Sequence, residues 1–272
     1  MIVDEWSLWQ RSGRRSERTI SERARVISDF LNSTGADPIT VTPMVIAGWM
    51  AGHGEWSQST ASTYHSYLMS FFKWLVMMDY RRENPMHKLQ GPRRPERSPR
   101  PVSDSDLVTL FNTRMHRRTK VMILLAALAG LRVSEIARVR GEDIDRDAHR
   151  IHIVGKGGKH AWVPLHPLLV EVAAGMPQTG WWFPGTARPG DPIRSKSVSD
   201  IITGVMRRAN IAGTPHALRH WYATTLLDEG ADLRTVQELM RHSSVQTTQV
   251  YTKVPDKRRS EAVGRLNPFR AA

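Results

Sequence analysis

Apolar side chains recur every three or four positions along two long stretches of the first 90 residues. This spacing is typical of amphipathic helices, and it predicts helices over residues 16–31 and 59–78. Between them, Thr42-Pro43 is a favourable helix start, because proline is tolerated in the first turn. The pattern predicts a small helical bundle over residues 1–90. The second stripe is the wider one and contains Tyr64, Tyr67, Leu68, Phe71, Phe72, Leu75 and Val76.

A second helical region begins at Ser103, which we expect to cap a helix with Asp106 in the capping-box position. Residues 119–129 are almost all apolar, so they predict a buried helix that ends at Gly130. Further helices are expected over 167–174 and 198–209. The loop-rich stretch between these two carries Trp181, Trp182 and Phe183, which we expect to pack in a core or between domains.

The one stretch with strand-like alternation spans residues 143–165. Apolar and polar side chains alternate on both sides of the turn Gly155-Lys156-Gly157-Gly158, which predicts a β-hairpin. The turn lacks the spacing of a nucleotide-binding phosphate loop. A lysine at such a tip is usually just solvated.

The chain closes with a further run of helices. A stripe through Leu218 and Leu226 predicts one helix that ends near Gly230, and Asp232 is a plausible N-cap for the next. A third, short helix is expected after Ser243-Ser244. The second helix takes its core side chains from Leu233, Val236, Leu239 and Met240.

Proline and arginine dominate residues 91–101, which therefore predict an extended linker between two domains. The fold expected for the 272 residues is mainly α with one small antiparallel β-sheet. Residues 1–90 form the first domain and residues 102–254 the second, followed by a tail over 255–272.

Charge points to a polyanionic partner. The formal net charge is +13, and it is distributed unevenly. Residues 1–95 carry 12 basic and 9 acidic side chains, whereas residues 96–272 carry 27 and 17. Nucleic acid is the commonest partner of such proteins, although a basic, solvated surface is the simpler alternative.

The absence of cysteine excludes disulfides, thiolate metal sites and cysteine nucleophiles, and it fits a reducing cytoplasm. The acidic N-terminus does not resemble a secretory signal, and no apolar run approaches the roughly 20 residues that a membrane span needs. We expect a cytoplasmic protein that does not bind membranes.

His216 and Arg219 are three residues apart and emerge from one helix face, while His242 and Tyr251 follow beyond the next helix. Arginine matches phosphate oxygens, and histidine can donate to phosphate or move a proton. A tyrosine becomes a useful nucleophile where cations stabilise the charge that builds on a phosphate. The set predicts phosphoryl transfer to a tyrosine hydroxyl without a metal.

This stretch resembles the C-terminal motifs of tyrosine recombinases, the phage integrase and Xer family. Members of the family have the motif H-x-L-R-H, followed by a Gly-His-Ser-like loop and then by a tyrosine within T-x-x-Y-T. The matching residues here are 216–220, 241–244 and 247–252. Arg241 stands where many members have glycine, and Ala217 where many have aspartate. Neither position is catalytic in the family.

The family's G-L-R-x-S-E motif is also present, at residues 130–135. Taken alone, Arg132 and Glu135 would be a structural ion pair. The resemblance implies instead that Arg132 is the first catalytic arginine and Glu135 its supporting acid. Lys156 follows Arg132 by 24 residues and would be the catalytic lysine of the hairpin turn, with Lys159 as the nearby alternative.

The resemblance implies a mechanism without cofactor or metal. Tyr251 would attack a DNA phosphodiester and form a 3′-phosphotyrosyl bond. Arg132 and Arg219 would stabilise the transition state. Lys156 would protonate the leaving 5′-oxygen, and His216 would accept the tyrosine proton or bind phosphate. His242 would bind the phosphate.

The resemblance further implies a two-domain clamp on double-stranded DNA at specific attachment sites. Residues 1–90 would be the core-binding domain, of SAM-like fold, and would leave no room for an arm-binding domain. A homo-tetramer would act on DNA, and the tail would dock on a neighbouring subunit or simply fray. An accessory directionality factor is compatible with this scheme. The basic residues expected to contact DNA are Arg14, Arg15, Arg18, Lys73, Arg81, Arg93, Arg94 and Lys159.

Phage integration and excision is the favoured function. The alternatives are a Xer-like dimer resolvase, a type-IB-like topoisomerase and a catalytically inactive DNA-binding module. A topoisomerase would use the same residues without strand exchange. The intact set of six catalytic positions argues against an inactive module.

Overall fold

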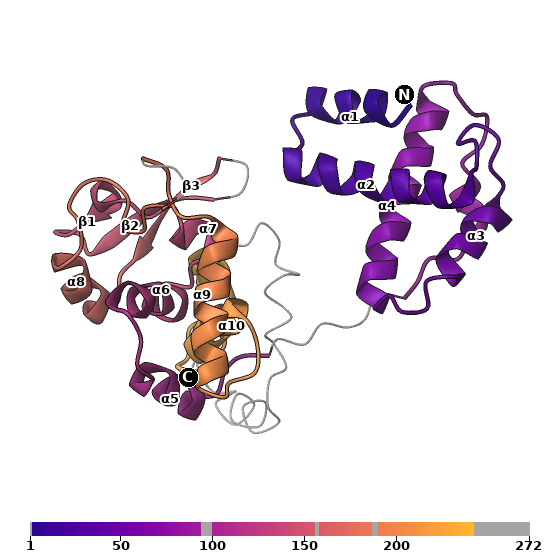
Figure 1. The fold of residues 1–272 in the computed structure, drawn as a ribbon. Helices are drawn as coiled ribbons and strands as arrows, with labels where there is room; N and C mark the ends of the chain where they lie inside the picture. Colours follow the sequence, from indigo (N-terminus) through magenta and orange to yellow (C-terminus); the bar gives the residue numbers. More distant parts are fainter. Residues whose placement is uncertain (1, 94–99, 156–157, 187–189, 242–272) are drawn as a thin grey trace, which may run out of the picture. The chain divides into compact units, whose positions relative to one another are not determined.

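A computed structural model of the chain describes residues 2–93, 100–155, 158–186 and 190–241. The chain separates into two compact units, Met1–Glu96 and Arg97–Ala272, which are described here one at a time (Figure 1). Some sequence predictions lie outside the described residues. These are the predictions for Arg94, Lys156, His242, Tyr251, the short helix after Ser244 and the tail over 255–272.

The described part of the first unit is helical throughout. Ser16 and Ser57 cap the two longest helices, each accepting a hydrogen bond from the backbone N–H three residues on. Both helices were expected from the apolar spacing. The elements are α1 (Ile2–Ser12), α2 (Glu17–Thr34), α3 (Pro43–Ala51), α4 (Gln58–Met77) and the 3-10 helix η1 (Pro85–Lys88).

Aromatic side chains form the centre of the first unit. Trp6 of α1 is fully buried, and its ring meets Phe71 of α4 edge to face with centroids 5.1 Å apart. Phe30 of α2 makes similar contacts with Trp49 and Phe72. The apolar spacing defines no separate helix over residues 2–12, because α1 contributes only one large apolar side chain to the buried core.

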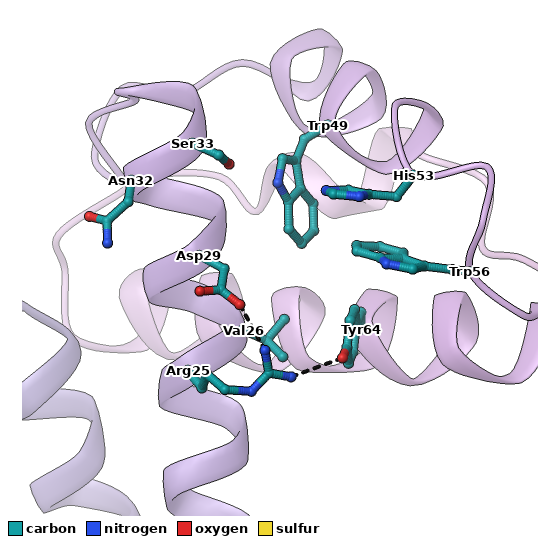
Figure 2. A pocket seen from close by; sticks show the side chains of 9 residues that line it. All are labelled: Arg25, Val26, Asp29, Asn32, Ser33, Trp49, His53, Trp56 and Tyr64. Carbon is teal, nitrogen blue, oxygen red and sulfur yellow. Dashed lines mark hydrogen bonds and ion pairs between the residues drawn. The ribbon is translucent and has the colours of Figure 1, made fainter.

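A hollow of about 540 Å³ opens between α2, the end of α3 and the start of α4 (Figure 2). Arg25 crosses it, donating to Asp29 at 2.8 Å and to the Tyr64 hydroxyl at 2.9 Å. The rings of His53 and Trp56 stack on its far side, 4.1 Å apart. These bonds tie α2 to α4.

The second unit contains the predicted sheet and the remaining helices. In chain order its described elements are α5 (Asp104–Asn112), α6 (Arg117–Leu128), α7 (Val133–Ile136), η2 (Gly141–Asp143), β1 (Ile144–Asp145), β2 (Arg150–Val154), β3 (His160–Pro164), α8 (Pro167–Ala174), α9 (Ser195–Arg208), α10 (Pro215–Asp228) and α11 (Leu233–Leu239). The described residues thus confirm a mainly helical chain with one small antiparallel sheet.

Helix α6 is the centre of this unit. Every residue from Val121 to Ala127 is buried, and α8, α9 and α10 pack around it. The sheet has the order β1-β2-β3, with Ile151 opposite Val163 and Ile153 opposite Ala161. The inward face of this hairpin therefore joins the same core.

The local signals read from the sequence hold in this unit. Ser103 and Asp106 form the expected capping box, and Asp232 caps α11 by accepting from the Thr235 N–H. Trp182 and Phe183 are buried in the core, as expected. Trp181 differs, because it stays partly exposed beneath the Arg140 guanidinium, 3.9 Å from its ring centroid.

None of the helices described here combines the length and apolar character that a bilayer crossing requires.

Candidate active site

The turn between α6 and α7 places Arg132 next to the core. Gly130 adopts a left-handed conformation with φ +57, and a Cβ on it would lie 2.5 Å from Cδ1 of Tyr222. Only glycine fits there, since any other side chain would meet both the backbone strain and the tyrosine ring. The chain reverses at this point, and Arg132 becomes the N-cap of α7.

Arg132 and Glu135 form the predicted ion pair. Nη1 of Arg132 donates to Oε1 of Glu135 at 2.9 Å, and the Arg132 backbone N–H donates to Oε2 at 2.9 Å. The Glu135 side chain is 3% exposed, whereas that of Arg132 is 36% exposed. The carboxylate is therefore fixed inside the protein, and it holds a guanidinium that still reaches the surface.

Burial alone would raise the pKa of Glu135. The charge of Arg241, the Arg132 backbone N–H and the charges of Arg132 and Arg219 outweigh burial, so the pKa of this carboxyl lies below its ordinary value. Glu135 is thus ionised at neutral pH and orients its arginine partners.

Arg219 lies on α10 and is 1% exposed. Its Nη1 donates to the carbonyl oxygen of Gly130, and its Nη2 donates to that of Met240. The guanidinium therefore joins the α6–α7 turn to the end of α11. Its charge lowers the pKa of both Glu135 and His216, which places it within the same electrostatic site.

His216 and His220 occupy neighbouring turns of α10, with ring centroids 4.2 Å apart in an edge-on arrangement. His216 keeps an exposed edge. Packing around its ring lowers the pKa of His216, and the charges of Arg219 and Arg132 lower it further. Burial, His216 and Arg219 lower the pKa of His220 to about 4. Both rings are neutral at pH 7, so His216 can accept a proton.

The β2–β3 turn begins beside this cluster. A Cβ on Gly155 would lie 4.0 Å from Oε1 of Glu135. The Gly155 N–H donates to the Lys159 carbonyl oxygen at 2.7 Å, which links the two strand ends. Lys159 itself is exposed. Gly155, the residue that follows β2, thus lies next to the Arg132–Glu135 pair.

Arg241 is a member of the site that the sequence analysis missed. Its Nη2 donates to Oε2 of Glu135 at 2.8 Å and to the Gly130 carbonyl oxygen at 3.1 Å. The available signal was a basic residue directly before His242. Sequence alone did not show that this side chain folds back toward a carboxylate 106 residues earlier.

The basic residues expected to bind DNA fall into two groups. Arg14, Arg15, Arg18, Lys73 and Arg93 are exposed. Arg81, by contrast, uses its guanidinium for contacts within the first unit. Its Nη1 donates to the Pro38 carbonyl at 2.7 Å and its Nη2 to that of Val41 at 2.9 Å, while the guanidinium lies over the Phe72 ring. Arg81 therefore has a structural role in the first unit.

Among the described residues, no cluster of three or more histidine, aspartate or glutamate side chains is arranged to hold a metal ion. What the described residues bring together is cationic. Arg132 and the neutral His216 reach the surface of a basic unit, and the buried Arg219 and Glu135 lie behind them. Such a group can bind a phosphate and stabilise additional negative charge on it.

Comparison with known proteins agrees with this chemistry. The model of the phage integrase family matches residues 104–258. Tyrosine recombinase XerC of Bacillus pumilus is 34% identical over 220 residues, a match that covers 73% of this chain and 71% of that protein.

Two solved structures extend the comparison. The integrase from mycobacterium phage Brujita is 44% identical, covers 99% of this chain and 93% of its own, and superposes with a TM-score of 0.53. A lambda integrase tetramer bound to a Holliday junction has a TM-score of 0.75 at 17% identity, covering 89% of this chain and 76% of that one, and this shows the fold alone. This chain belongs to the phage integrase family and is a tyrosine site-specific recombinase.

Proposed function

We propose that this recombinase is a phage integrase, which joins and separates phage and host DNA at specific attachment sites. The identity with the Brujita phage integrase extends over nearly the whole chain, at 44%. The match to XerC of Bacillus pumilus reaches 34% over 73% of the chain. The higher and longer identity favours integration over dimer resolution.

The cleavage step follows from the predicted site residues. Oη of Tyr251 attacks the phosphorus atom and gives up its proton to His216. The bond to the 5′-oxygen breaks, and Lys156 supplies the proton that makes it a hydroxyl. Arg132, Arg219 and His242 hold the non-bridging oxygens as charge builds on them. Glu135 orients Arg132. The phosphotyrosyl bond retains the energy of the phosphodiester, so a 5′-hydroxyl from another strand can reseal it.

The observation that supports the cleavage chemistry is the meeting of Arg132, Arg219 and His216 from two separate elements. All three act electrostatically on one another or on Glu135. The turn that carries Lys156 begins next to that carboxylate. An ordinary structural ion pair would require neither the exposed guanidinium of Arg132 nor a neutral, exposed histidine beside it.

The first unit is proposed as the core-binding domain, with its exposed Arg14, Arg15, Arg18 and Lys73 on DNA phosphates. Residues 91–101, including Arg93 and Arg94, would be the linker, and Lys159 would contact DNA from the hairpin. Lambda integrase forms a tetramer on a Holliday junction. By analogy, four copies of this chain would act together on two attachment sites, and an accessory factor would set the direction of recombination.

Covalent capture tests the proposal. The protein is mixed with fragmented, lightly nicked DNA from the phage and its host, so that short cleaved strands diffuse away and resealing is blocked. Protein-linked DNA is recovered after denaturation and sequenced. The matched control is Tyr251→Phe, which lacks only the attacking oxygen. We expect capture at one site in each genome with a shared core sequence, and none in the control.

Other patterns of DNA capture would favour one of the alternative functions. XerC similarity keeps dimer resolution as the second candidate, and capture at one site shared by both copies of a replicon would favour it. Capture spread along all DNA would indicate a topoisomerase. Tight binding without capture would indicate an inactive DNA-binding module.

A further inference from the structure

Arg241 makes contacts that an exposed helix-terminal arginine would not make. Its side chain is 10% exposed, and it donates to three acceptors in two parts of the unit. Nη1 reaches back to the Leu239 carbonyl oxygen at 2.8 Å, while Nη2 bonds both Glu135 and the Gly130 carbonyl. One guanidinium thus closes the end of α11 and joins it to the α6–α7 turn.

The backbone of Arg241 is also unusual. Its φ of +53 lies in the left-handed region, which side chains other than those of asparagine and aspartate rarely adopt. The surrounding structure must hold the residue in this strained conformation, and such strain often accompanies a functional site. Glycine would adopt the same backbone without strain but would supply no guanidinium.

The carboxylate of Glu135 divides its oxygens between two arginines. Oε1 accepts from Nη1 of Arg132, and Oε2 accepts from Nη2 of Arg241 and from the Arg132 backbone N–H. Arg241 therefore occupies the oxygen that a forked, two-bond pairing with the Arg132 guanidinium would use. Among the described residues, the Arg132 guanidinium is held by one bond, and it keeps its exposed edge for a phosphate.

The net charge around Glu135 also favours phosphate binding by Arg132. With Arg132 alone, the carboxylate would neutralise the positive charge that is to bind phosphate. With Arg241 and Arg219 also present, three guanidinium groups surround one carboxylate, and the site keeps a net positive charge. Because Arg241 is the largest contributor that lowers the pKa of Glu135, it also keeps this carboxyl ionised.

We propose that Arg241 is a positioning residue for DNA cleavage, which fixes the end of α11 to the Glu135–Arg132 pair. This inference rests on the proposed function, because residue 242 directly follows and Tyr251 lies nine positions beyond that. The point from which the nucleophile's segment leaves α11 is then set by the same carboxylate that orients the catalytic arginine.

The test compares single-turnover cleavage of a nicked attachment-site DNA by four full-length proteins: wild type, Arg241→Gly, Arg241→Lys and Arg234→Ala. Arg241→Gly relieves the backbone strain and removes the guanidinium. Misplacing reacting groups by about 1 Å can cost on the order of 100-fold in rate, so we expect cleavage to slow by roughly 10- to 100-fold with little change in DNA affinity. Arg241→Lys should recover part of the rate.

Arg234→Ala is the matched control, because it removes an exposed arginine from α11 that pairs only locally, with Glu238 among the described residues. It should cleave at the wild-type rate. A further measurement separates positioning from general stability. In a Glu135→Gln background, Arg241→Gly should have at most a small additional effect, since the two residues act through one contact. The cleavage rate of Arg241→Gly should also begin to fall at a higher pH than that of wild type as the solution is acidified, because Arg241 no longer lowers the pKa of Glu135.

The outcomes distinguish the positioning role of Arg241 from the proposed function. If Arg241→Gly cleaves as fast as wild type, or if its loss adds fully to that of Glu135→Gln, the positioning role is overturned while the proposed function stands. If wild type itself captures no DNA, or Tyr251→Phe captures as much as wild type, the proposed function fails and the positioning role fails with it.

Discussion

Arg219 donates a hydrogen bond to the carbonyl oxygen of Gly130, which stands 89 residues earlier in the chain. The second arm of the same guanidinium donates to Met240, at the end of α11. A single buried side chain thus fixes the turn before Arg132 relative to the helix before His242.

Arg219→Lys should separate the chemistry from DNA binding. Lysine carries the same charge but cannot donate in two fixed directions, so it can serve only one of the two carbonyls. Losing one of these two anchors should misplace the groups that they position, and a misplacement of about 1 Å can cost on the order of 100-fold in rate. We expect single-turnover cleavage to fall by about that factor, while DNA affinity in a filter-binding or gel-shift assay changes less than threefold or so. Equal losses in both assays would contradict the prediction.

Gly130→Ala should destabilise the second unit by roughly 2–4 kcal/mol, from the clash with Tyr222 and the left-handed backbone together. Gly180→Ala is the control, because Gly180 has φ +74 in the same unit and nothing within 4 Å of the added Cβ. It should cost only about 1 kcal/mol. Urea unfolding of both variants measures the difference. Similar losses would mean that the tyrosine ring moves aside freely.

Acid should destabilise the protein through His220. Its pKa in the folded protein is about 4, below the ordinary value of 6.5, so between these pH values the unfolded chain binds more protons than the folded one. Stability is therefore complete above about pH 6.5 and is lost as the pH falls toward 4. The lowered pKa of His216 adds in the same direction. Glu135 would contribute only at lower pH, beneath its ordinary value of 4.5.

His220→Gln checks this directly, because glutamine does not titrate. Free energies of unfolding measured at pH 7.5, 6.5, 5.5 and 4.5 should fall less steeply for the variant than for wild type. A slope equal to that of wild type would show that the imidazole of His220 is not the source.

Arg81 and Arg18 should behave in opposite ways. Arg81→Ala removes three hydrogen bonds to backbone carbonyls and should lower the stability of the first unit by about 1–3 kcal/mol, without changing the salt dependence of DNA binding. Arg18→Ala leaves stability near wild type. If Arg18 contacts one phosphate, its loss lowers the slope of log affinity against log salt by about 1. The free energy of unfolding and the salt dependence of DNA affinity are measured for both variants.

Much of the fold could be predicted because its signals are local. The Ser103–Asp106 capping box, the Asp232 cap and the apolar run before Gly130 each depend on residues within a few positions of one another. The small sheet followed from alternation around the Gly155–Gly158 turn. Helix α1 gave no such signal, since its position depends on one tryptophan that meets Phe71 of a helix far along the chain.

The site was predictable to the extent that the family motifs cover it. Arg132, Glu135, His216 and Arg219 were all named from the sequence, and the structure gathers these four. The contact of Arg241 with Glu135 could not be read in this way, because it joins positions 106 residues apart and requires an unusual backbone angle. The contacts of Arg81 could not be read from the sequence for a related reason. Its charge suggested DNA, and folding brings three backbone carbonyls within reach of its donors.

The pairing of Ile151 with Val163 has a consequence for how this hairpin can vary among relatives. Both side chains face the core, and side chains alternate along a strand, so one residue inserted within β2 would turn every following core position outward. A residue inserted after Val154 and before His160 would leave the pairing of the two strands intact. Length differences between related chains should therefore concentrate in that turn, where they would alter the segment that carries Lys156 while the core pairing stays in register.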